Sequence, residues 1–149
     1  MATITNQAAL SYNGITTLSN IAVGELVEVL TVTKTAADTT YTPGSTKTYA
    51  ISLVNSGAAA FTGLTITDTL GSYAFNNGTL YPLTYVTGSL LYYVNGILQA
   101  TPAIADTAPL TVTGLSVPAG GSAMLVYSAT VNEYAPLGVE DSIVNTVSV

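Results

Sequence analysis

Three polar residues stand where strand alternation predicts side chains that point into a protein core. Each shares its phase with apolar neighbours: Lys34 with Leu30 and Val32, Asp68 with Leu64, Ile66 and Leu70, and Asn145 with Ile143, Val147 and Val149. Burial favours a neutral lysine, which is a nucleophile, and a protonated carboxylic acid, which can polarise an amide. The alternative is that Asp68 and Asn145 satisfy backbone groups at strand ends, while Lys34 reaches past the sheet edge to solvent.

The composition excludes most other chemistry. The chain of 149 residues contains no His, Cys, Arg or Trp, so it lacks Ser-His and Cys-His nucleophile pairs and ordinary zinc or copper ligands. Lys34 and Lys47 face eight acidic residues, for a net charge of −6, which disfavours nucleic acid and anionic membranes as partners. Asp68 with Glu25 or Glu28 could form a glycosidase pair, but no Arg, His or Trp accompanies them to position a sugar. We therefore predict a protein that is not an enzyme and that uses no cofactor.

Two further groups of residues could bind ligands. Asp106, Glu140 and Asp141 could hold calcium, but their spacing matches no known calcium loop, and solvated loop carboxylates explain them better. The tyrosines that could form a sugar-stacking platform are Tyr73, Tyr81, Tyr85, Tyr92 and Tyr93. Their strand positions, and the absence of Trp, favour core and cross-strand packing instead. We therefore predict no metal site.

Short strands must position all of these residues, because apolar and polar residues alternate along the chain. The predicted strands are Ile4–Tyr12, Leu26–Thr35, Lys47–Val54, Gly63–Leu70, Ser89–Val94, Ile97–Ala100, Leu110–Leu115, Ser122–Val131 and Ser142–Val149. Asn95-Gly96 predicts a two-residue hairpin turn, and Gly, Pro and Asn clusters such as Pro43-Gly44 and Asn76-Asn77-Gly78 predict the other corners. The chain is thus predicted to be an all-β antiparallel sandwich, with a barrel as the second choice.

The order of motifs from residue 26 to 149 resembles a known family. The motifs are Val32-Thr33-Lys34-Thr35, Thr42-Pro43-Gly44-Ser45, Thr48 to Gly57, Leu64 to Leu70, Tyr85 to Ser89, Leu115 to Ser122 and Ile143-Val144-Asn145-Thr146. Together they resemble the conserved-repeat, immunoglobulin-like domains of prokaryotic surface proteins, the "domain of unknown function eleven" type. The resemblance implies an immunoglobulin-like β-sandwich that serves as a structural or adhesive unit outside the cell.

A second resemblance concerns the three inward polar residues. Lys34, Asp68 and Asn145 stand on the first, a middle and the last predicted strand of the sandwich. This set resembles the intramolecular isopeptide constellation of Gram-positive pilin and adhesin domains, which implies a covalent bond between Lys34 and Asn145. Asn6 has the equivalent phase in the leading strand, so Lys34 could instead bond to Asn6 of a neighbouring copy.

The leading segment repeats the pattern of the last strand, since residues 3–12 resemble residues 142–149. We therefore divide the chain into an extension at 1–24 and the immunoglobulin-like sandwich at 25–149. The extension is predicted to be a donor strand, followed by a tether from Asn13 to Gly24. Its assembly residues would be Ile4, Asn6, Ala8, Leu10 and Tyr12. The alternatives are an extra strand packed on its own sandwich, or a remnant of where a longer chain was cut.

The predicted function is a structural subunit that assembles with copies of itself. Strand donation from head to tail does not close, so it would build an extracellular filament or surface appendage. The alternatives are a passive spacer or adhesive module of a surface protein, which could contact glycans or host proteins, and an independent sugar-binding module. No secretory signal and no apolar run of about 18 residues is visible in the sequence. We expect the protein at the cell surface or outside the cell, by an unassigned export route and without membrane insertion.

Overall fold

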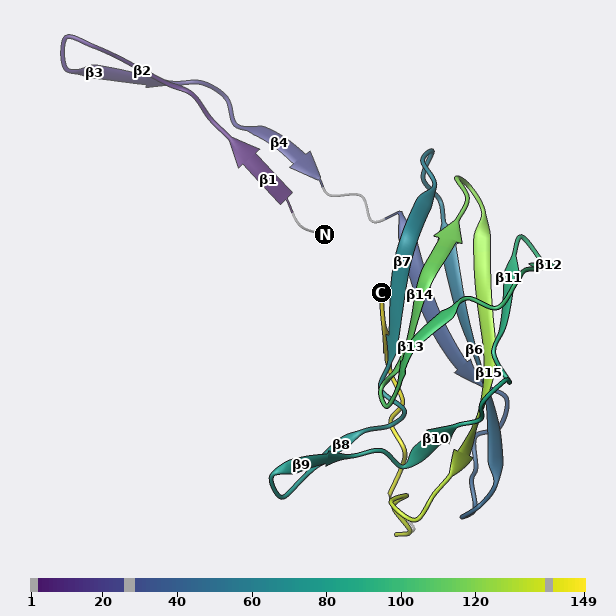
Figure 1. Ribbon diagram of the computed structural model, residues 1–149. Helices are drawn as coiled ribbons and strands as arrows, with labels where there is room; N and C mark the ends of the chain where they lie inside the picture. Colours follow the sequence, from purple (N-terminus) through teal and green to yellow (C-terminus); the bar gives the residue numbers. More distant parts are fainter. Residues whose placement is uncertain (1–2, 26–28, 139–140) are drawn as a thin grey trace.

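The protein is built from short β-strands (Figure 1). The computed structural model describes residues 3–25, 29–138 and 141–149, so the beginning of the predicted strand Leu26–Thr35 lies outside the described residues. The strands are β1 (Thr3–Asn6), β2 (Ala9–Tyr12), β3 (Ile15–Leu18), β4 (Ala22–Glu25), β5 (Leu30–Ala36), β6 (Thr46–Asn55), β7 (Phe61–Asp68), β8 (Tyr73–Phe75), β9 (Gly78–Leu80), β10 (Leu83–Tyr85), β11 (Leu91–Val94), β12 (Ile97–Leu98), β13 (Ala103–Thr107), β14 (Leu110–Val117), β15 (Ser122–Val131) and β16 (Val147–Ser148). Within the described residues, no helix is long and apolar enough to span a membrane.

Two antiparallel sheets form the body of the molecule. One sheet has the order β12-β11-β15-β6-β5, with β10 also paired to β15, and the other has the order β13-β14-β7-β16. Their facing sides enclose a core built largely of Leu, Val, Ile, Ala and Tyr. The prediction of an all-β, immunoglobulin-like antiparallel sandwich is confirmed, and the barrel is not observed.

The long central strands follow the predicted alternation. The inward residues are Tyr49, Ile51 and Leu53 in β6, and Ala123, Leu125, Tyr127, Ala129 and Val131 in β15, and all of them are buried. The two strands pair without interruption from Ser122↔Val54 to Thr130↔Thr46. The predicted turn at Asn95-Gly96 joins β11 to β12, with φ values of 49° and 79°, as a type I′ hairpin requires.

The short strands differ most from the predicted ones. Of the predicted strand Ser142–Val149, only β16 is observed as a strand. It pairs with β7 at two positions, Val147↔Asp68 and Ser148↔Thr67. Four short strands between residues 73 and 107 were not predicted: β8, β9, β10 and β13. Strands of three to five residues carry too few alternating positions to be recognised by period. The predicted corner Asn76-Asn77-Gly78 is the turn between β8 and β9, where Asn76 has a φ of 52°.

The N-terminal segment folds into a long hairpin. β1 pairs with β4 from Thr3↔Glu25 to Asn6↔Ala22, and β2 pairs with β3 from Ala9↔Leu18 to Tyr12↔Ile15. The sequence predicts a tether at residues 13–24, but these residues return along the leading strand as β3 and β4. The reason is Asn13-Gly14, whose φ values of 50° and 77° make a tight two-residue turn. Figure 1 shows this hairpin extending away from the sandwich.

Candidate functional site

A buried ion pair lies between the two sheets. Lys34 is on β5 and Asp68 is the last residue of β7, and their side chains are 8% and 1% exposed. The Lys34 Nζ donates a hydrogen bond to Asp68 Oδ2. Lys34 therefore does not reach past the sheet edge to solvent, as the alternative interpretation of the sequence had it.

Tyr127 connects this pair to Asn145. Its hydroxyl donates to Asp68 Oδ2 at 2.6 Å and accepts a hydrogen bond from Asn145 Nδ2 at 3.3 Å. Tyr127 occupies the middle of β15, with its ring buried in the core. The structure thus brings Lys34 and Asp68 into contact and places Asn145 two hydrogen bonds from Asp68.

Backbone groups hold the acid and the amide in place. The amide N–H of Leu70 donates to Asp68 Oδ1 at 3.0 Å, and the N–H of Gly71 donates to Asn145 Oδ1 at 3.1 Å. Gly71 has a φ of 71°, and a Cβ added there would collide with the side chain of Ile143. Asp68 and Asn145 therefore satisfy backbone donors at the end of β7, and Gly71 leaves room for the C-terminal segment.

Two aromatic rings surround the amine. Tyr49 stacks on Tyr127 with ring centres 5.5 Å apart, and Lys34 Nζ lies 5.0 Å from the centre of the Tyr49 ring. Burial lowers the pKa of Lys34, although the charge and the hydrogen bond of Asp68 oppose this shift. Burial raises the pKa of Tyr127, and the negative charge of Asp68 adds to the rise. Burial therefore disfavours the charged form of the Lys34 amine while Asp68 favours it, and both causes at Tyr127 favour the protonated hydroxyl.

The chemistry available to this site is amide chemistry. Lys34 and Asn145 line the same groove, which has a volume of about 460 Å³ and opens to solvent beside β5. Asp68 is close enough to the amine to exchange a proton with it.

The role of Tyr127 was missed from the sequence. It could have been inferred, because a tyrosine in an inward phase needs a buried partner for its hydroxyl.

The other candidate acids do not form a site. Asp106 is exposed and accepts hydrogen bonds from the N–H groups of Thr107 and Ala108, and the exposed Asp141 accepts one from Gly138. No three metal-ligating side chains lie together in the described part of the chain. Glu140 and Glu28 lie outside the described residues, as does the side chain of Glu25. For the glycosidase pair, Asp68 is enclosed in the core and already engaged by Lys34 and Tyr127.

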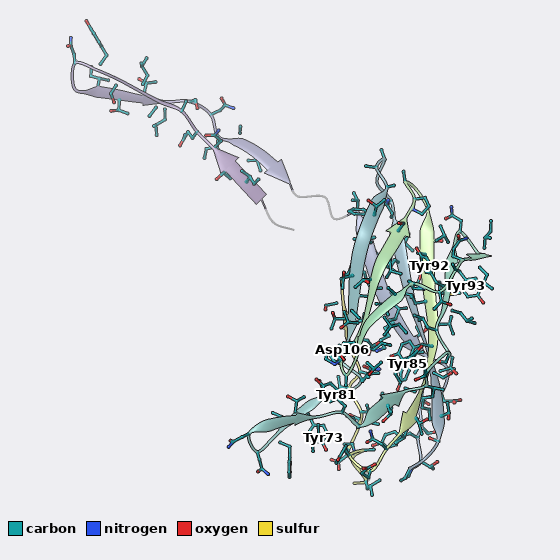
Figure 2. The ribbon with its side chains drawn as sticks, in the orientation of Figure 1. Tyr73, Tyr81, Tyr85, Tyr92, Tyr93 and Asp106 are labelled. Carbon is teal, nitrogen blue, oxygen red and sulfur yellow. The ribbon has the colours of Figure 1, made fainter. Side chains whose placement is uncertain are left out.

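The five candidate tyrosines do not form a platform. Tyr85 and Tyr92 are buried in the core, whereas Tyr73 is exposed on β8. Tyr92 uses its hydroxyl to donate to the carbonyl of Ser116 at 2.8 Å. Figure 2 shows the tyrosines spread along the length of the sandwich, with Tyr92 and Tyr93 on β11, far from Tyr73. Packing accounts for the buried members of this group.

The predicted assembly residues lie along one strand of the exposed hairpin. Ile4, Leu10 and Tyr12 are 74%, 72% and 75% exposed, and Asn6 and Ala8 are exposed as well. Every side chain described from residue 4 to residue 24 is exposed. The extension therefore does not pack on its own sandwich, which was one of the alternatives.

The comparisons with known proteins identify the fold. No family model and no curated protein matches the chain. The chain is similar to three solved structures of the RrgB pilus protein of Streptococcus pneumoniae, each at 17% identity. The structure of the pilus backbone matches with a TM-score of 0.59 over 79% of this chain and 50% of that chain. Two full-length structures match with TM-scores of 0.58 and 0.56, over 84% and 85% of this chain.

These likenesses concern the fold. The chain spans half of the first structure and about a quarter of the two full-length structures. At this identity the likeness shows that the body of the chain is a pilin-like β-sandwich. The conserved-repeat resemblance drawn from the sequence motifs stays a prediction, because no family model matches.

Proposed function

We propose that this chain is a non-enzymatic structural subunit that assembles into an extracellular filament or surface appendage by β-strand exchange. The observation that carries the proposal is the hairpin of residues 3–25, which exposes Ile4, Leu10, Tyr12, Ile15 and Leu18 by 59–75%. The likeness of the sandwich to a pilus backbone protein agrees with a structural role at the cell surface.

The energetics of the hairpin favour a partner. An isolated two-stranded hairpin is marginally stable in water, because neither of its faces is covered. Full burial of one Ile or Leu side chain contributes about 1.5–3 kcal/mol, so a neighbouring sheet that covered Ile4 and Leu10 would stabilise the hairpin substantially. The hairpin of each copy would be covered by the next copy, and such a contact does not close on itself. The product is a fibre.

The alternative is a spacer or adhesive module within a surface protein. The full-length pilins to which this chain is similar are about four times longer than the part that it matches, so a sandwich of this kind can be one unit of a longer protein. A spacer or adhesive module would remain monomeric in solution. The assembly state therefore separates the two functions.

Electron microscopy of the purified chain tests the proposal. We expect long polymers from the wild type, and folded monomers when residues 1–25 are deleted or when Ile4→Asp and Leu10→Asp are combined, because the new charges would be buried unpaired. The matched control combines Thr5→Asp with Ser11→Asp, which adds the same charges in the opposite phase of the same strands. Polymers of normal length from the deletion variant would disprove strand exchange.

We also propose that Lys34 and Asn145 are joined by an amide bond inside the sandwich. The neutral Nζ would attack Cγ of Asn145, the Cγ–Nδ2 bond would break, and Asp68 would carry the proton from Nζ to the departing ammonia. The shared groove and the contact between Lys34 and Asp68 support this step. Asn6 of a neighbouring copy is the alternative amide, and a bond to it would link subunits.

Intact mass spectrometry under denaturing conditions distinguishes these bonds. The intramolecular bond makes the chain lighter by one ammonia, and Lys34→Ala or Asn145→Ala should restore the calculated mass. A bond to Asn6 would instead leave covalent oligomers after denaturation, and Asn6→Ala would remove them. A monomer of calculated mass in the wild type would show that neither bond forms.

A further inference from the structure

One strand of the sandwich offers a long and regular unpaired edge. β5 is the last strand of its sheet, and it pairs with β6 on its other side from Leu30↔Asn55 to Ala36↔Tyr49 without a register shift. It contains no Pro or Gly, and its one charged residue, Lys34, points inward. A straight edge of this kind is a template for an added strand.

The other edges in the described structure are shorter or irregular. β12 has two residues, and β13 contains a bulge between Ile104 and Asp106. β7 is covered by β16 only at Thr67 and Asp68, and its remainder contains register shifts against β14 and Gly63 at a φ of 69°. Short strands, bulges and charges are the features that discourage strand addition.

A groove accompanies the free edge of β5. Lys34 and Ala36 of β5 line the groove of about 460 Å³ together with Ile143 and Asn145 of the C-terminal segment. A second groove, of about 500 Å³, continues past Tyr41 and shares Ile143 with the first. The C-terminal residues 141–146 follow this groove without forming a strand. The place beside β5 is therefore not filled by a strand of the described chain.

The hairpin and the groove lie toward opposite ends of β5. The hairpin precedes Leu30, the first residue of β5, whereas the groove begins at Lys34 and extends beyond Ala36, the last residue. Figure 1 shows the hairpin near the end of the sandwich where β5 starts. A hairpin that enters the groove of another copy would therefore connect copies head to tail.

The two surfaces are also compatible in charge. Residues 3–24 contain no charged residue. Both lysines at the groove are already paired, Lys34 with Asp68 and Lys47 with Asp38. The one charged residue of the hairpin, Glu25, is its last residue, so docking residues 3–24 there would bury no hairpin charge without a partner.

From this we infer that the acceptor of the exchanged hairpin is the free edge of β5 together with the adjoining groove, in a second copy of this chain. The inference rests on the proposed strand exchange and names its acceptor. β1 of one copy would add to β5 of the next, with Ile4 turned toward the inward side that holds Val32, and with Thr5 on the outer side beside Thr33 and Thr35. This placement also brings Asn6 to the side of β5 that carries Lys34.

Pairs of single-cysteine variants test the acceptor. The chain contains no Cys, so each introduced thiol is unique. Thr5→Cys protein would be assembled separately with Thr33→Cys and with Thr35→Cys protein, and then treated with a short bis-maleimide that tolerates small differences in register. Directly opposed residues on neighbouring strands have Cβ atoms about 4.5–5.5 Å apart, which such a linker spans. Leu98→Cys on β12 and Ala103→Cys on β13 place matched thiols on the other edges.

We expect linked dimers, on denaturing gels, from the β5 variants and only background linkage from the Leu98→Cys and Ala103→Cys controls. Polymers that link through β12 or β13, or polymers that never link through β5, would overturn the acceptor while leaving strand exchange intact. A wild type that forms no polymers would overturn the proposed function, and the acceptor with it. Electron microscopy of every mixture before crosslinking separates these outcomes.

Discussion

The same short pattern, a leucine and a tyrosine two residues apart, occurs in the hairpin and in the core. In β2, Leu10 and Tyr12 are 72% and 75% exposed, whereas in β15, Leu125 and Tyr127 are each 1% exposed. β15 has β6 on one side, β10 and β11 on the other, and the second sheet across the core. β2 has only β3. The alternation of a strand therefore shows that one of its faces is suited to burial, but the number of partners decides whether that face is buried within the chain.

This difference bears on the role of the hairpin. In the sandwich, apolar alternation stabilises the single chain, and its loss would unfold the domain. In the hairpin, residues of the same types are exposed and contribute little to the stability of one copy. Their burial between two copies would therefore stabilise the contact between those copies. Selective changes in each region can test this separation.

The largest effect is expected from Asp68→Ala, which acts on the sandwich alone. Removing the carboxylate leaves the Lys34 ammonium buried without a partner, which we expect to lower the free energy of unfolding by about 3–5 kcal/mol. The control is Asp38→Ala, because Asp38 is 62% exposed in its pair with Lys47 and should contribute about 0–1 kcal/mol. Urea titration of the hairpin-deleted monomer measures both.

A double variant sharpens this prediction. Lys34→Met combined with Asp68→Leu removes both charges and keeps apolar volume, so it should recover the part of the loss that comes from the unpaired ammonium. The Leu70 N–H and the Tyr127 hydroxyl lose their acceptor in both variants, so that part of the loss should remain. If the double variant were as unstable as Asp68→Ala, the loss would come from these two hydrogen bonds, from packing or from a missing covalent bond rather than from an unpaired charge.

The second effect compares the two leucines directly. Leu125→Ala opens a cavity in the core and should lower the free energy of unfolding by about 2–5 kcal/mol. Leu10→Ala should change the unfolding of the sandwich by less than about 0.5 kcal/mol, because its side chain is exposed, but it should weaken polymer formation. Denaturation of monomers and electron microscopy of polymers provide the two measurements. Equal destabilisation by both substitutions would contradict the distinction between the regions.

A smaller effect is expected at glycines with positive φ. Gly71 and Gly14 have φ values of 71° and 77°, but a Cβ would collide with Ile143 at Gly71 and would meet nothing within 4 Å at Gly14. Both Gly→Ala substitutions strain the backbone, so Gly14→Ala in the hairpin controls for that strain. We expect Gly71→Ala to lower the free energy of unfolding by about 1–3 kcal/mol, while Gly14→Ala leaves the sandwich unchanged. Displacement of Ile143 by the new Cβ should also disturb the hydrogen bond from the Gly71 N–H to Asn145 Oδ1.

The sequence allowed the body of the fold to be predicted, because long strands such as β6 and β15 carry enough alternating residues to define their inward faces. It also placed Lys34, Asp68 and Asn145 in inward phases. It did not show that Asn13-Gly14 folds the extension into a hairpin, although Asn95-Gly96 gave the same signal and was interpreted as a turn. Nor could alternation show that Tyr127 lies between Asp68 and Asn145, because that contact joins strands from both sheets.

The smallest effect is expected in alkaline solution. Burial raises the pKa of Tyr127 above its ordinary value near 10, so the unfolded chain releases this proton before the folded chain does. The stability from this group is therefore complete below about pH 10 and is lost as the pH rises further, by at most about 1.4 kcal/mol per pH unit. The lowered pKa of Lys34 acts in the opposite direction: stability rises with pH between its folded pKa and the unfolded value of 10.5.

Tyr127→Phe should flatten the decline in stability above pH 10, whereas Tyr12→Phe in the exposed hairpin should leave it unchanged. Each substitution would be made in the monomeric Ile4→Asp/Leu10→Asp variant, which keeps the hairpin, and unfolding at several pH values measures both slopes. An equal change in the two variants would show that burial of Tyr127 does not cause the decline above pH 10.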